Sequence, residues 1–86
     1  SEAKIDISIM RSLLEWGSSR EFLYTNTISC LDQIPGSKIE FSIIPRIKTF
    51  MDTTSKTQEI KKIAYRWANE NKKIEQAIEK DFGEVQ

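Results

Sequence analysis

The chain has 86 residues, of which 38% are hydrophobic and 30% charged, and its 13 basic and 13 acidic side chains give zero formal net charge. This length suits one small domain with one core, and the balanced charge gives no overall attraction to nucleic acid or an anionic membrane. Cys30 is the only cysteine and histidine is absent, which excludes an internal disulfide and an ordinary zinc site. No apolar run is long enough for a membrane span or a signal peptide, so we expect one intracellular, monomeric domain over residues 1–86.

The first predicted helix has about three turns and ends at Gly17. Asp6 is its candidate N-cap. Its apolar residues share one helical face, made of Ile7, Met10 and Leu14, with Ile9, Leu13 and Trp16 beside them.

A second helix is predicted between Gly17 and Pro35. Ser18 and Glu21 have the spacing of a capping box. Apolar residues then recur at helical intervals, at Tyr24, Ile28, Leu31 and Ile34. Pro35 and Gly36 break the chain after them.

Two short helices are predicted next, on either side of Pro45. Ser37 with Glu40 repeats the capping-box spacing and opens a helix through Phe41, Ile43 and Ile44. Proline is tolerated in a first helical turn, so "PRIKTF" indicates a separate helix with Ile47 on its buried side.

The longest predicted helix runs from about Lys56 to Phe82, with Trp67 as its central core residue. Its inner face carries Ile60, Ile63, Ala64, Trp67, Ile74 and Ile78, and Asn71 interrupts this stripe. Such a helix is about 40 Å long, more than the width of so small a bundle, so we expect residues 79–86 to fray or project. The expected fold class is therefore all-α, a compact bundle of four to five short helices with a long C-terminal helix.

No arrangement of residues indicates catalysis. The chain lacks histidine and a glycine-rich phosphate loop, and acidic pairs such as Glu75 and Glu79 lie on a solvated helix surface. We expect no enzyme activity, no metal and no cofactor in this segment.

Charge is distributed unevenly along the chain. Between Arg46 and Lys73 there are eight basic residues and three acidic ones, whereas residues 1–40 hold six acidic and four basic ones. The second half could therefore present a basic face to an acidic peptide, although a solvated helix surface has the same pattern.

The order of the segments resembles the TFIIS N-terminal domain, a small helical bundle of transcription elongation proteins. The resemblance rests on "ISCLDQIPGSKIEFSI", "PRIKTF", a polar turn and "EIKKIAYRWANENKK". The closing helix of that family has similar residue pairs at similar spacing. The corresponding pairs here are Glu59-Ile60, Ile63-Ala64 and Lys72-Lys73. The family's usual tryptophan falls on Asn71, and Trp67 takes the preceding apolar place.

A second branch of the superfamily, the integrase-binding domain of LEDGF, is similar in the sequence "RIKTF" and in Ile63-Ala64-Tyr65. The resemblance covers about residues 10–73. It implies that Phe50 contacts bound peptides from a loop and that Trp16 is an apolar contact in the first interhelical loop. Gly17 stands where that branch has an aspartate, and Asp52 where it has a valine.

The resemblance implies a nuclear module that captures short disordered, partly acidic peptide motifs of transcription elongation or chromatin proteins. Its expected binding residues are Trp16, Gly17, Arg46, Lys48, Phe50, Met51 and Asp52. The parent protein could be a fungal Set-type histone lysine methyltransferase, with its enzyme activity outside this segment. Trp16 and Phe50 could instead be ordinary core or rim residues.

Two other classes of function also fit the sequence. A nucleic-acid-binding helical module would use the charges between Arg46 and Lys73 on phosphates. A helical oligomerisation domain would pack Trp67, Ile74 and Ile78 between chains.

Overall fold

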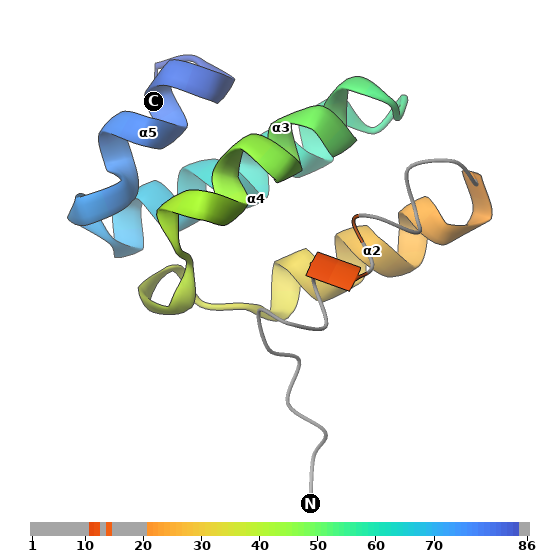
Figure 1. The fold of residues 1–86 in the computed structure, drawn as a ribbon, viewed down its shortest axis with the longest axis horizontal. Helices are drawn as coiled ribbons and strands as arrows, with labels where there is room; N and C mark the ends of the chain where they lie inside the picture. Colours follow the sequence, from red (N-terminus) through yellow and green to blue (C-terminus); the bar gives the residue numbers. More distant parts are fainter. Residues whose placement is uncertain (1–10, 13, 15–20, 85–86) are drawn as a thin grey trace, which may run out of the picture.

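The computed structural model describes residues 11, 12, 14 and 21–84, and in this part of the chain all regular structure is helical (Figure 1). The helices are α2 (Glu21–Gln33), α3 (Ile44–Asp52), α4 (Thr57–Glu70) and α5 (Lys72–Phe82), with two 3-10 turns, η1 (Gly36–Lys38) and η2 (Phe41–Ile43), between α2 and α3. The all-α fold class is confirmed. Residues 1–10, 13, 15–20, 85 and 86 lie outside this description.

The segment between Pro35 and Pro45 differs from the predicted helix. Glu40 has an extended backbone, with φ −105° and ψ 151°, and separates η1 from η2. Neither turn has a side-chain cap, so the capping-box prediction for Ser37 and Glu40 is wrong. The prediction for Pro45 is confirmed, because this proline stands in the first turn of α3, where its missing N–H has no helical acceptor.

The long C-terminal helix predicted from the sequence is divided in two. Asn71 has φ −145° and ψ 102°, which is extended backbone, and it ends α4 and begins α5. After this break α5 turns back and packs against both α4 and α3 (Figure 1). Ile74, Ile78 and Phe82 on its inner face are buried, so the expectation of a projecting end is wrong as far as Phe82.

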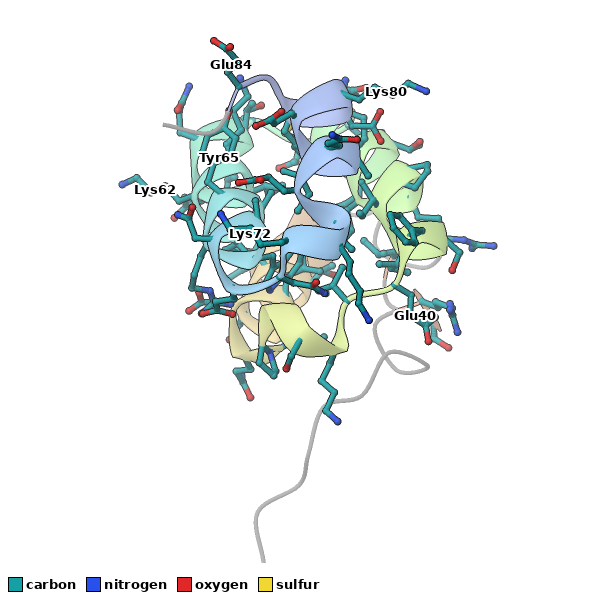
Figure 2. All side chains as sticks on the ribbon, turned by 90° about the vertical axis from the view of Figure 1, so that its left-hand side faces the viewer. Glu40, Lys62, Tyr65, Lys72, Lys80 and Glu84 are labelled. Carbon is teal, nitrogen blue, oxygen red and sulfur yellow. The ribbon has the colours of Figure 1, made fainter. Side chains whose placement is uncertain are left out.

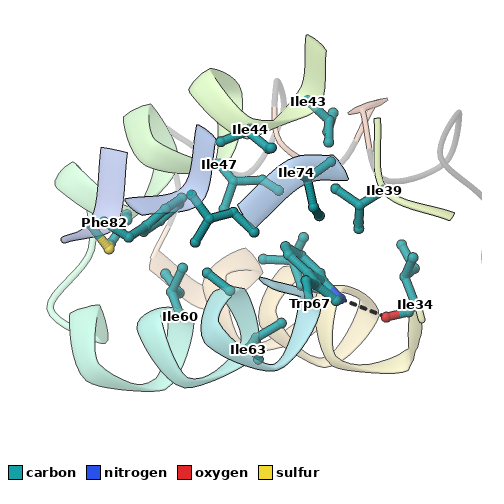
Figure 3. Packing of buried hydrophobic residues seen from close by; sticks show 14 of the residues in the cluster. Ile34, Ile39, Ile43, Ile44, Ile47, Ile60, Ile63, Trp67, Ile74 and Phe82 are labelled. Carbon is teal, nitrogen blue, oxygen red and sulfur yellow. Dashed lines mark hydrogen bonds between the residues drawn. The ribbon is translucent and has the colours of Figure 1, made fainter. Parts of the chain in front are cut away.

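The core is built mainly of isoleucine side chains around Trp67 (Figure 3). The indole ring is almost fully buried, and its Nε1–H donates a 2.7 Å hydrogen bond to the carbonyl oxygen of Ile34. A buried indole N–H needs such an acceptor, since leaving it unpaired would cost free energy. The prediction that Trp67 is the central core residue of its helix is confirmed.

Three residues near Trp67 in the sequence also form hydrogen bonds with the backbone where α2 ends and η1 begins. Arg66 donates to the carbonyl oxygens of Asp32 and Ile34 at 2.9 and 3.0 Å. The backbone N–H of Gly36 donates to Glu70 Oε1 at 2.6 Å, and Asn71 Nδ2 donates to the Gly36 carbonyl at 3.0 Å. We call this set, Arg66, Trp67, Glu70 and Asn71, the turn clamp.

The turn clamp requires a glycine at position 36. A Cβ atom there would lie 2.8 Å from Glu70 Cβ and from the Trp67 carbonyl oxygen, and 2.9 Å from Trp67 Cα. Two of these atoms belong to the backbone of α4, so relief would require moving the helix.

We therefore expect Gly36→Ala to lower the free energy of unfolding by about 1–3 kcal/mol, as overpacking of a tight contact does. Urea denaturation followed by circular dichroism would measure this. Ser37→Ala is the matched control, because Ser37 is exposed and its truncation should change stability by less than about 0.5 kcal/mol. Equal midpoints for Gly36→Ala and the wild type would contradict the close approach.

Trp67→Ala should cost about 3–5 kcal/mol, since it removes a large buried ring and one of the two donors to the Ile34 carbonyl. A domain of this size has a total stability of only about 5–15 kcal/mol, so a large unfolded fraction is expected. A cooperative thermal transition near the wild-type temperature would refute the central position of Trp67.

Candidate peptide-binding surface

The structure buries the two apolar residues expected to contact a partner. Phe50 is 1% exposed and Met51 4% exposed, and both belong to the inner face of α3 with Ile44 and Ile47. The expectation that the Phe50 ring is exposed at a peptide-binding rim is wrong. The other interpretation, a core phenylalanine, describes the observed position.

Two features of the structure explain this burial. The sequence prediction ended the helix at Phe50, whereas α3 continues to Asp52, so Phe50 and Met51 keep their places on its apolar side. In addition, α5 folds back against α3 instead of projecting, which adds apolar surface on the side where these residues lie. Trp16 and Gly17, the other expected contact residues, lie outside the described part.

The polar residues expected at the site lie on the outer side of α3. Arg46 and Asp52 are exposed, and Lys48 is half-buried. Lys48 Nζ lies 2.8 Å from both carboxylate oxygens of Asp52, one helical turn away. Such an exposed pair contributes no more than about 0.5 kcal/mol to stability, but it partly neutralises Lys48 toward an incoming partner.

Much of the basic excess between Arg46 and Lys73 is engaged within the domain. Lys48, Lys56, Arg66 and Lys72 each lie within 4 Å of a carboxylate oxygen. Arg66 in addition bonds two backbone carbonyls. Since these charges have internal partners, the excess of lysine and arginine does not by itself form a phosphate-binding face.

Phe41 is a surface residue that the sequence analysis missed. Its side chain is 61% exposed, and it is the one large hydrophobic residue found exposed in the described part of the chain. The sequence analysis grouped it with Ile43 and Ile44 in a single helix. It instead begins η2 directly after the extended Glu40, so the helical spacing of Ile44, Ile47 and Met51 does not continue back to it.

The surroundings of Phe41 are defined by local contacts. Arg11 forms an ion pair with Glu40 and donates a 3.3 Å hydrogen bond to Ser42 Oγ, so residues on both sides of Phe41 are tied to an earlier part of the chain. On the side of α3, Pro45 and Arg46 are exposed. We call Phe41, the exposed residues Pro45, Arg46 and Thr49, and half-buried Lys48 the Phe41 surface.

The Phe41 surface and its flanks have a local excess of positive charge. Among the described residues there, Arg11, Lys38, Arg46 and Lys48 are basic and Glu40 and Asp52 are acidic, so these six side chains carry a net charge of +2. Both anions are already paired, Glu40 with Arg11 and Asp52 with Lys48. This patch can therefore attract an acidic segment although the whole chain is neutral.

The described residues contain no group of three or more histidine, cysteine, aspartate or glutamate side chains that could hold a metal ion. Partial burial raises the pKa of the Cys30 thiol, which disfavours the reactive thiolate. None of the described helices combines the length and apolar character needed to span a membrane.

Comparison with known proteins gave no match to a family model, a curated protein or a solved structure. The resemblance to the TFIIS N-terminal domain and to the LEDGF branch therefore stays a prediction from the residues quoted above.

The different burial of the two phenylalanines gives a stability prediction. Phe50→Ala should lower the free energy of unfolding by about 3–5 kcal/mol, because it removes a buried ring from the core. Phe41→Ala should change it by less than about 0.5 kcal/mol, because the ring is already in water. Parallel urea titrations of both variants would measure the difference, and a similar loss in both would place Phe41 in the core.

Proposed function

We propose that this domain is a protein–protein interaction module that captures short disordered, partly acidic peptide segments, with Phe41 as the apolar contact. The supporting observation is the exposure of Phe41, and of Arg46 in the first turn of α3, on a segment anchored by buried Ile43 and Ile44. Phenylalanine, like the other aromatic residues, and arginine are enriched in protein interfaces relative to the rest of the protein surface.

The apolar part of the interaction would come from covering the Phe41 ring. A peptide side chain such as leucine or phenylalanine, laid across Phe41 and Pro45, removes apolar surface from water on both partners. Because Phe41 begins η2 and is followed by buried Ile43 and Ile44, little ordering of the domain is needed. The peptide must be ordered on binding, so affinity should be modest, in the micromolar range.

The electrostatic part would select acidic peptides. Arg46 and Lys38 flank Phe41 in the chain, while Glu40 is held by Arg11. Carboxylates next to the peptide's apolar residue would gain from this local excess of positive charge, mainly through a faster association rate. Lys48 would contribute little, because Asp52 already holds its ammonium group.

The resemblance to the TFIIS N-terminal domain supports a setting for this activity. It favours partners among transcription elongation and chromatin proteins, a nuclear location, and a parent such as a fungal Set-type histone lysine methyltransferase. Within this proposal the domain acts by binding and not by catalysis. The contact phenylalanine of the LEDGF branch has no exposed counterpart at Phe50, so Phe41 takes over the apolar role.

The proposal is tested with a fluorescein-labelled peptide in which one phenylalanine is flanked by aspartate and glutamate, titrated with the domain while anisotropy is recorded. Phe41→Ala should weaken binding about 30-fold, equivalent to about 2 kcal/mol, with unchanged folding. Arg46→Glu should weaken binding and lower its salt dependence.

Lys62→Glu is the charge-matched control, since Figure 2 shows Lys62 on the opposite side of the molecule from Glu40. It should leave peptide affinity within about twofold if binding occurs at the Phe41 surface. Equal weakening by Arg46→Glu and Lys62→Glu would refute a localised site. A labelled DNA duplex that binds more tightly than the peptide would point instead to nucleic acid.

A further inference from the structure

The junction between α4 and α5 consists of one residue, Asn71. Its backbone N–H ends α4 by donating to the Trp67 carbonyl at 2.9 Å. Its side chain caps α5, because Oδ1 accepts from the backbone N–H of Lys73 at 3.0 Å. The amide nitrogen Nδ2 donates to the Gly36 carbonyl at 3.0 Å. These two side-chain hydrogen bonds hold the chain reversal in place.

The sequence on both sides of the junction favours a continuous helix. No glycine or proline occurs between Thr57 and Phe82. Glu70, Lys72 and Lys73 next to the junction are exposed and are good helix formers. If Asn71 adopted helical angles, the unpaired carbonyls at the end of α4 would accept from the first N–H groups of α5. The result would be one helix about 39 Å long.

A continuous helix would remove α5 from its own core. Figure 3 shows Ile74 and Phe82 of α5 in the same apolar layer as Ile47 of α3 and Ile60 of α4. All four side chains are almost fully buried. Straightening would expose both sides of this layer to water, which is unfavourable unless another α5 covers the vacated face. The segment that fits this face is the α5 of a second copy.

We propose that α5 is exchanged between two copies of the chain and that Asn71 shifts the balance toward the closed monomer. In the symmetric dimer each α5 packs on the α3 and α4 of the other copy and keeps every contact it makes in the monomer. One of these contacts is the 2.8 Å hydrogen bond from Tyr65 Oη to the Phe82 carbonyl. The two forms then differ in the junction and in the cost of association, as is general for domain swapping.

In the exchanged dimer, Ile74 and Ile78 of one copy would pack against the other copy, which is the role expected of them in an oligomerisation domain. It does not depend on peptide binding, because the Phe41 surface lies on the outer side of η2 and α3, whereas α5 packs on the inner side. Failure of one proposal therefore leaves the other unaffected.

A matched pair of substitutions at the junction tests the exchange. Asn71→Ala and Asn71→Gly remove the same two side-chain hydrogen bonds, but alanine favours helix and glycine disfavours it. We expect Asn71→Ala to have twice the mass of one chain in sedimentation equilibrium, and Asn71→Gly to stay monomeric. A monomeric Asn71→Ala with the same melting temperature as Asn71→Gly would overturn the proposal.

Isotope-filtered NMR then distinguishes exchange from simple side-by-side association. In a dimer assembled from labelled and unlabelled Asn71→Ala chains, contacts between the Tyr65 ring and Phe82 should appear between different copies. A dimer with these contacts only within one copy overturns the exchange. If Asn71→Ala does not fold, the wild-type chain refolded at high concentration replaces it, and the absence of any dimer with Tyr65 to Phe82 contacts between copies has the same meaning.

Discussion

The fold depends on the hydrogen bonds by which one end of α4 holds the turn after α2. This turn carries the carbonyl groups of Asp32 and Ile34 and the N–H of Gly36, and a backbone group that is buried and unpaired is costly. Four neighbouring residues of the turn clamp supply hydrogen-bond partners for this turn, with Trp67 at the centre of the core. Residues more than thirty positions apart are thereby fixed together, with α2 on one side of α4 and α3 on another.

The turn clamp also decides the course of the chain after α4. Asn71 reaches the Gly36 carbonyl from an extended backbone, and the same side chain caps α5. The reversal at Asn71 sends α5 back over α3 and α4, and this return is compatible with the burial of Phe50 and Met51. A contact at one end of the molecule therefore sets the course of the helix that packs against α3.

The sequence predicted the structure correctly where the spacing of neighbouring apolar residues and prolines alone determines it. Helical periodicity identified α2 and the core position of Trp67, and Pro45 marked the start of α3. The prediction of one long C-terminal helix failed at Asn71. The residues next to Asn71 favour helix, and the break depends on Gly36, which is distant in the sequence. The errors at Phe50 and Phe41 have similar causes. The burial of Phe50 depends on the return of α5, and the exposure of Phe41 depends on the extended residue Glu40 before η2. Trp16 and Gly17 stay predictions.

The two sides of α3 have different physical requirements, and this separates stability from recognition. Ile44, Ile47, Phe50 and Met51 on the inner side must match the volume of a tightly packed core, so changes there alter folding before they alter binding. Phe41 of η2 and Arg46 on the outer side of α3 are exposed and lie outside the core, so their replacement leaves the core unchanged. A recognition surface on the outer side can therefore change its partner preference at little cost in stability. The inner side offers no such freedom, which is why a buried Phe50 is poorly suited to be the direct contact of a bound peptide.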